Sequence, residues 1–179
     1  MVMSRILIAA TIVGTVFGAM PAAAQCSGAG TCSTTNTASV TVGALVQLEM
    51  SATTTTLTSP TIADLTVGYV ADAGPTFVVH ANQDWTMSIK AAGSNPTNWT
   101  YTGTKGGVKA IGDLAWSSDV SGTFAPLTGT NATVASGATS TDDTPVSLFF
   151  QTAYSTDYTA TGNRPGVYSL PIVFTLSAP

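Results

Sequence analysis

Charge is scarce in this 179-residue chain: Asp, Glu, Lys and Arg make up 8% of it, and the formal net charge is -4. An ordinary soluble domain carries about 25% charged residues. Only four Lys and Arg residues follow Arg5, too few to neutralise a phosphate backbone. Glu and Lys, which helical bundles and coiled coils use heavily, are rare. The composition therefore argues against a nucleic-acid binder and against a helical bundle.

Residues that carry catalysis are also lacking. His80 is the one histidine, and it stands inside the apolar stretch 77–81. A Ser-His-Asp site needs a base beside a nucleophile and a third group that orients it, and the chain has no Gly-x-Ser-x-Gly elbow and no phosphate loop with a following Lys. We therefore expect His80 to be structural, and we expect no catalytic residue, no cofactor, no metal and no enzymatic activity.

Three carboxylates lie in two successive turn regions of the predicted fold. Asp142 and Asp143 are adjacent, and Asp157 follows in the next turn region. Calcium takes six to eight oxygen ligands, which Thr side chains and backbone carbonyls could help to supply. The Asp-x-Asp-x-Asp-Gly spacing is absent, however, so the pattern favours solvated turns and leaves calcium open.

Residues 1–24 have the pattern of a cleaved signal peptide. Arg5 is followed by 15 uncharged, mainly apolar residues, Ile6 to Met20, and then by Pro21 and the small residues Ala22–Ala24. A membrane-spanning helix needs about 20 apolar residues, and no later stretch is long enough to cross a bilayer. We expect cleavage before Gln25 and a secreted protein, located in the periplasm, at the cell surface or outside the cell.

Both cysteines, Cys26 and Cys32, follow this segment. An exported chain with an even number of cysteines favours a disulfide, and the alternative of a metal or redox pair lacks a second pair of ligands. We predict a Cys26–Cys32 disulfide in a flexible tail over residues 25–37. Residues 38–179 are then left to form one domain.

The remainder of the chain has the residues and spacing of short β-strands. Threonine is abundant, with 32 residues, and β-branched side chains favour strands. In residues 39–50, Val40, Val42, Val46 and Leu48 fall on one phase of a period-two pattern, which predicts a long, half-buried strand.

Residues 76–81 and 85–91 flank a turn at Asn82–Asp84, which predicts a hairpin with Trp85, Met87 and Ile89 pointing inward. Residues 145–154 and 166–176 are further strands, and Pro171 predicts an edge position or a bulge in the last one. Strands at intervals of 8–12 residues predict an antiparallel, Ig-like β-sandwich of about seven to nine strands, with a closed barrel as the alternative.

The three tryptophans have two interpretations. Trp85, Trp99 and Trp116 are expected in or around the sandwich core. The functional alternative is an exposed aromatic platform that stacks on sugars, with Trp99 and Trp116 as candidate glycan contacts.

The end of the chain resembles the closing motif of bacterial WxL cell-wall-binding domains. That motif has Tyr, an aliphatic residue, Thr-Trp-x-Leu and a final Pro. Tyr168 and Ile172 take the positions of the Tyr and of the aliphatic residue. Val173 and Phe174 stand in place of the Thr and the Trp, and Leu176 and Pro179 match the Leu and the final Pro. Trp85-Thr86-Met87 is similar to the first Trp-x-Leu motif, with Met in place of Leu. The resemblance implies a module that binds the cell wall or another glycan.

The chain is also similar to secreted fimbrial subunits of the spore coat U type. Residues 38–42, Ala-Ser-Val-Thr-Val, resemble their opening strand, and Gly166-Val-Tyr168 resembles their closing strand. Those subunits usually carry a core disulfide, which this chain lacks. Both resemblances imply a β-sandwich at a bacterial surface.

These observations predict a non-enzymatic structural or adhesive subunit of the envelope or of a fimbria-like filament. The segment with Val40, Val42, Val46 and Leu48 could complete a neighbour's open sheet by strand addition, with further copies of the chain or other surface subunits as partners. Pairing of that segment within its own domain stays open. The alternative function is a WxL-like module that binds peptidoglycan or another glycan.

Overall fold

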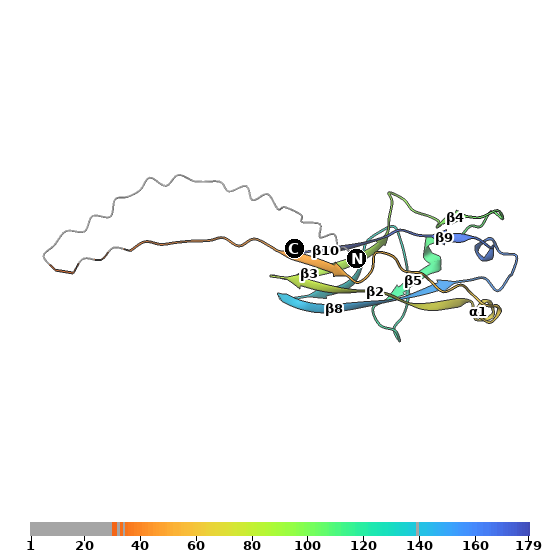
Figure 1. Ribbon diagram of the computed structural model, residues 1–179, viewed down its shortest axis with the longest axis horizontal. Helices are drawn as coiled ribbons and strands as arrows, with labels where there is room; N and C mark the ends of the chain where they lie inside the picture. The colour runs from red at the N-terminus through yellow and green to blue at the C-terminus, as the bar shows by residue number, and fades with distance from the viewer. Residues whose placement is uncertain (1–29, 32, 34, 139) are drawn as a thin grey trace, which may run out of the picture. The chain divides into compact units, whose positions relative to one another are not determined.

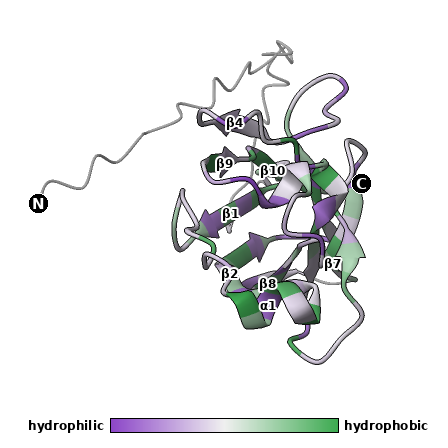
Figure 2. Cartoon of the chain, turned by 90° about the vertical axis from the view of Figure 1, so that its right-hand side faces the viewer, coloured by the Kyte–Doolittle hydropathy of each residue, from purple (hydrophilic) through white to green (hydrophobic). Residues whose placement is uncertain are grey.

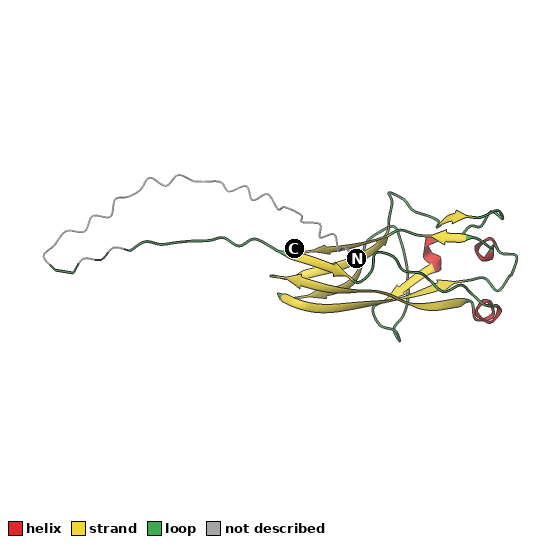
Figure 3. Ribbon diagram, viewed as in Figure 1, coloured by secondary structure: helices red, strands yellow, loops and turns green. Residues whose placement is uncertain are grey.

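The strands of the computed structural model are arranged in antiparallel sheets (Figures 1 and 3). Residues 30–31, 33, 35–138 and 140–179 are described, so the predicted signal peptide and the predicted Cys26–Cys32 disulfide lie outside the described residues. The chain divides into two units, Met1–Thr41 and Val42–Pro179, and all the described strands belong to the second. The predicted all-β fold is confirmed.

The larger sheet has five strands in the order β1-β2-β8-β5-β6. Its central pair is the longest, because β2 and β8 each have 13 residues and run antiparallel from the pair Tyr69–Ala153 to the pair Ala81–Thr141. At one edge, β1 pairs with the end of β2, from Val46–Ala81 to Met50–Phe77. The bounds of these strands are β1 Val46–Met50, β2 Tyr69–Ala81, β5 Leu114–Ser117, β6 Ala125–Pro126 and β8 Thr141–Ala153.

The second sheet has three strands in the order β10-β3-β7, with bounds Ile172–Ser177, Trp85–Ala91 and Ala132–Gly137. Within this sheet, β10 pairs only with β3 among the strands that the structure describes. The predicted edge position of the last strand is therefore confirmed, and the break at Pro171 separates β10 from β9 (Val167–Ser169). β9 pairs with β4 (Thr100–Thr102) in a small separate ladder.

One short helix, α1 (Ile62–Val67), precedes β2. The Thr61 hydroxyl accepts a hydrogen bond from the Asp64 backbone N–H, and the Asp64 carboxylate accepts one in return from the Thr61 backbone N–H. The hydrogen bonds that the Asp64 carboxylate accepts from the Thr61 backbone N–H and from the Thr61 hydroxyl hold the pKa of Asp64 below its ordinary value. Gly68 ends the helix with φ 92°, a conformation that favours glycine. Ile62 and Val67 are exposed, and Figure 2 shows hydrophobic bands, in green, on α1.

The core lies between the two main sheets because their strands alternate buried and more exposed side chains. β3 shows this completely: Trp85, Met87, Ile89 and Ala91 are buried, and the residues between them are half-buried. The predicted inward phase of this strand is confirmed. The other fully buried large side chains are Phe77, Val79, Leu114, Leu127 and Leu148.

Two local predictions are wrong. Residues 76–81 and 85–91 do not form a hairpin, because β2 pairs with β1 and β8, whereas β3 pairs with β10 and β7. Asn82–Asp84 instead carries the chain from one sheet to the other, so the apolar faces of β2 and β3 both reach the core. The predicted strand over residues 39–50 is reduced to Val46–Met50. In the structure, residues 39–45 have no strand partner and are exposed.

Candidate functional site

The segment before β1 carries aliphatic side chains that the fold leaves uncovered. Val40 is 86% exposed and Val42 is 68% exposed, although a two-residue spacing of valines is typical of a strand with a buried face. Val46 and Leu48, predicted as part of the same exchangeable strand, lie in β1 and pair with β2. The structure therefore separates the four predicted residues into a free pair and a pair used within the sheet.

Asn82 marks where this segment joins the sandwich. Its side-chain carbonyl accepts a hydrogen bond from the Leu45 backbone N–H, and its amide donates one to the Gly43 carbonyl. The Asn82 backbone N–H also donates to the Leu45 carbonyl. Residues 43–45 are thus fixed to the β2–β3 connection, and the preceding residues contain the exposed valines.

A large apolar groove opens along one side of the sandwich. Its cavity volume is about 1010 Å³. One wall is formed by Met50 at the end of β1 and by residues 52–60, and the other by residues 162–172 and Phe174, which run through β9 into β10. Its floor is formed by core side chains, including Trp99, Leu114 and Phe150. β1 and β10 lie close together here without forming a ladder. The groove therefore lies over buried core side chains, next to the edge of β10 that has no partner among the described strands.

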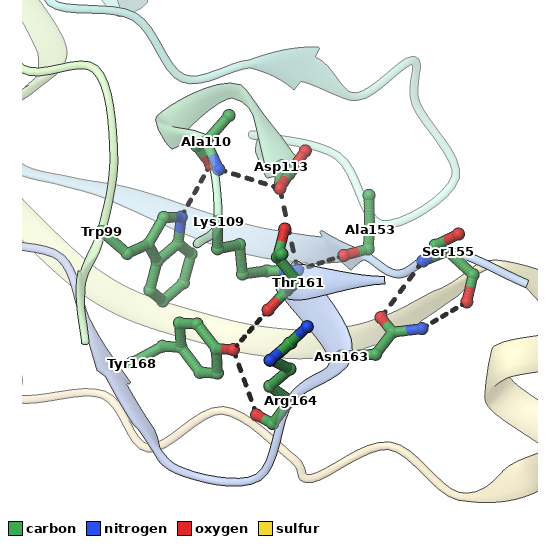
Figure 4. Close-up of polar contacts among 10 residues, drawn as sticks. All are labelled: Trp99, Lys109, Ala110, Asp113, Ala153, Ser155, Thr161, Asn163, Arg164 and Tyr168. Atoms are coloured by element: carbon green, nitrogen blue, oxygen red, sulfur yellow. Dashed lines mark hydrogen bonds and ion pairs between the residues drawn. The ribbon is translucent and has the colours of Figure 1, made fainter. Parts of the chain in front are cut away.

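One end of this groove is polar. Lys109 is 3% exposed, and its Nζ donates a hydrogen bond to the Ala153 carbonyl and lies 4.0 Å from Asp113 Oδ2 (Figure 4). The same ammonium is 4.2 Å from the centre of the Tyr154 ring, a cation–π contact. Lys109, Thr152 and Tyr154 all line the groove.

Lys109 also lines a second, smaller cavity of about 470 Å³. Asp113, Tyr154 and Asn163 contribute polar groups to its wall. The Asn163 amide donates to the Ser155 and Asp157 carbonyls and so holds the 155–163 loop closed. Tyr168 donates to backbone carbonyls of the same region. The polar end of the groove is therefore built from ordered loops. Nothing in the sequence pattern marks Lys109 as buried.

Burial lowers the pKa of Lys109 from its ordinary value of 10.5, because a low-dielectric environment disfavours the ammonium, and Asp113 opposes the shift only in part. The folded chain thus releases this proton at a lower pH than the unfolded chain. Between the two pKa values the unfolded state binds more protons, so the Lys109 contribution to the free energy of unfolding rises with pH and is constant below that window.

We predict that Lys109→Met removes this rise. Urea unfolding at a series of pH values up to 10.5 should show the wild-type free energy of unfolding gaining on that of the variant as pH increases. Tyr154, whose pKa is raised by burial first and by Asp72 second, has the opposite effect on the free energy of unfolding and is present in both proteins. Lys105→Met, at an exposed position, is the control and should follow the wild type. A parallel pH profile for Lys109→Met would contradict the assignment.

The tryptophans belong to the core cluster. Trp85, Trp99 and Trp116 are all buried, and Trp99 Nε1 donates to the Ala110 carbonyl. Trp116 Nε1 has no hydrogen-bond partner among the described residues. Neither Trp99 nor Trp116 presents an exposed ring face, so a glycan contact through them would require part of the core to open.

The residues of the WxL-like pattern lie mainly on two paired strands. In the β3–β10 ladder, Met87 is opposite Leu176 and Ile89 is opposite Phe174. Phe174 also packs on Phe77, with 4.7 Å between ring centroids. Of the other predicted positions, Trp85 and Ile172 are at ends of these strands, Tyr168 is on β9, and the Pro179 carbonyl accepts a hydrogen bond from Gln83.

His80 is half-buried and faces three carboxylates. Its Nε2 is 3.9 Å from Glu49 Oε1, and its Nδ1 is 3.5 Å from Asp142 and 4.0 Å from Asp143. Asp157 instead accepts hydrogen bonds from Thr159 in a separate turn. Within the described part of the chain, no group of three or more His, Cys, Asp or Glu residues could hold a metal ion.

Two further results bear on assignment. No described helix is both long enough and apolar enough to span a membrane. No protein-family model matches the chain, and no curated protein matches it. The WxL and spore coat U resemblances stay predictions, and the groove and the exposed valines are the structural features that indicate a function.

Proposed function

We propose that this chain is a non-enzymatic, secreted structural subunit of a bacterial surface, and that copies join by strand addition. In this mechanism, the segment of one copy that contains Val40 and Val42 enters the groove of another and pairs with the free edge of β10. The observation that carries the proposal is the coexistence of two exposed, in-phase valines and a groove with an apolar floor beside the edge of β10 that has no partner among the described strands.

The strand order supports this choice of acceptor. We compare the order β1-β2-β8-β5 facing β10-β3 with strands A-B-E-D facing F-C of an immunoglobulin domain, and we treat β7, beside β3, as an additional strand. In that interpretation the place of the last strand, G, beside F is the free edge of β10. An added strand there would gain backbone hydrogen bonds, cover the core residues at the groove floor and remove an exposed sheet edge.

The exposed valines provide the direct test. Replacing both Val40 and Val42 by Asp should abolish polymers, because two charges would have to enter an apolar groove in place of two aliphatic side chains. We expect assembly to weaken by more than a hundredfold. Size-exclusion chromatography and negative-stain microscopy of the exported protein measure it, and thermal unfolding should show an intact domain because both positions are exposed.

The matched control is Ser39→Asp with Thr41→Asp. These residues are also exposed and lie in the same segment, but they fall on the opposite phase, so their side chains would point away from the groove. This control should retain polymers. Normal assembly of the Val40→Asp, Val42→Asp variant would refute strand addition through these valines. A monomeric wild type that pellets with peptidoglycan would favour the glycan-binding alternative.

A further inference from the structure

The polar end of the groove contains a buried hydroxyl with an unused hydrogen bond. Thr152 is 2% exposed, and its Oγ1 has no partner among the described residues. Lys109, which is equally buried, has three donor hydrogens. One of them goes to the Ala153 carbonyl, and Asp113 Oδ2, at 4.0 Å from Nζ, is beyond hydrogen-bond distance. Both groups line the groove, so a hydrogen-bond acceptor placed there would satisfy groups that the isolated domain leaves incompletely paired.

The distance along the groove can be measured on β8. Phe77 pairs with Val146 on β8 and packs on Phe174 of β10, which fixes the level of the apolar end. Thr152 is six residues further along β8, from 146 to 152, or about 20 Å at about 3.4 Å per residue. An inserted segment therefore needs about six residues to reach from Phe174 to Thr152. Because β10 begins at Ile172, only the end of that segment at Phe174 pairs with β10, and the rest lies along residues 162–171.

The free segment has matching chemistry at this spacing. Asn36 lies six residues before Val42, so the two are on the same phase of a strand, with Ala38 and Val40 between them. Val46 and Leu48 are engaged in β1, which leaves only the preceding residues for insertion. One direction places Val42 near Phe174 and Asn36 at Thr152. The opposite direction would place a valine against the buried ammonium.

We infer that Lys109 and Thr152 form a polar stop that binds the Asn36 amide of a second copy of this chain and fixes the register of the inserted segment. The inference rests on the proposed function and adds to it a register and a direction. The Asn36 carbonyl accepts from Lys109 Nζ and from the Thr152 hydroxyl, and Val40 and Val42 cover the apolar part of the groove. Lys109 and Thr152 are then specificity-determining residues for the partner.

Thr152→Val separates this role from a merely structural one. Valine has nearly the same shape and removes the unpaired hydroxyl, so the unassembled domain should unfold at a higher temperature than the wild type. Assembly of the same variant should nevertheless weaken by about three- to tenfold. Thr133→Val, at an exposed position on β7, is the control and should leave assembly unchanged.

Asn36→Ala tests the other partner. It should weaken assembly by about tenfold or more, because it removes the acceptor that the second copy supplies to the buried ammonium. Thr35→Ala, on the opposite phase, should have no effect. Combining Asn36→Ala with Thr152→Val should weaken assembly less than the product of the single effects, because both remove the same interaction. Sedimentation of polymers at a series of protein concentrations measures all of these.

The outcomes distinguish the two proposals. If Asn36→Ala and Thr152→Val assemble like the wild type while Val40→Asp with Val42→Asp does not, strand addition stands and the polar stop is overturned. If the effects of Asn36→Ala and Thr152→Val multiply independently, the direct contact is overturned. If the wild type forms no polymers, the proposed function falls and the polar stop falls with it.

Discussion

Leu148→Ala should lower the free energy of unfolding by about 3–5 kcal/mol. Leu148 is 1% exposed in the middle of β8, and its side chain belongs to the core cluster between the two main sheets. Removal of buried methyl groups costs their transfer free energy and also leaves a cavity. Strands hydrogen-bonded on both sides cannot move easily to fill it, and β8 has β2 and β5 as neighbours.

Leu45→Ala is the control for this measurement. Leu45 is exposed in the segment before β1, so the same chemical change should alter the free energy of unfolding by less than about 0.5 kcal/mol. Urea unfolding of the unassembled protein, followed by tryptophan fluorescence, gives both values. Similar losses for the two variants would contradict the assignment of the core.

Period-two alternation predicted those parts of the fold in which a strand has a partner on each side. Trp85, Met87 and Ile89 are buried as expected because β3 lies between β10 and β7. The same pattern wrongly predicted a buried face for Val40 and Val42, because alternation shows only that a segment is able to bury one face. It does not show that the same chain supplies the surface that covers it.

Pairing partners were predicted less well than strands. The segments of β2 and β3 are close in sequence, and Asn82–Asp84 is composed of turn residues, so a hairpin was the simplest expectation. The side chain of Asn82 instead binds residues 43–45, and each strand finds its partners far along the chain. Local sequence carries little information on such a choice, because β2 and β3 can bury the same apolar faces either side by side or across the core.

The groove could be predicted only in part. The sequence indicated Val40 and Val42 as residues that a neighbour could bind, and it indicated the edge position of the last strand, but it did not indicate that the two valines are exposed. Lys109 was not, because it follows a glycine-rich stretch without periodicity, and its burial depends on Ala153 and Tyr154 from β8 and the loop after it. Thr152 is one of 32 threonines, and only the fold distinguishes its unpaired hydroxyl from the others.

Gly137→Val should lower the free energy of unfolding by about 3 kcal/mol. Gly137 pairs with Trp85 across the β3–β7 ladder, and the indole covers the place of a side chain. A Cβ at Gly137 would lie 2.5 Å from Trp85 Nε1 and 2.8 Å from Trp85 Cε2. The Trp85 ring, which is buried, would have to leave its position, and the core cannot refill that volume without shifting both strands.

Ser136→Val makes the matched comparison for that variant. Ser136 is the preceding residue of β7, is exposed and pairs with Thr86, so the same new side chain there points to solvent and suits a strand. Its free energy of unfolding should stay within about 0.5 kcal/mol of the wild type. In nitrogen-edited NMR spectra, Gly137→Val should move one of the three indole N–H signals, that of Trp85, far more than the other two. If Gly137→Val leaves that signal and the stability unchanged, Trp85 does not pack on β7, and the arrangement of the smaller sheet would have to be revised.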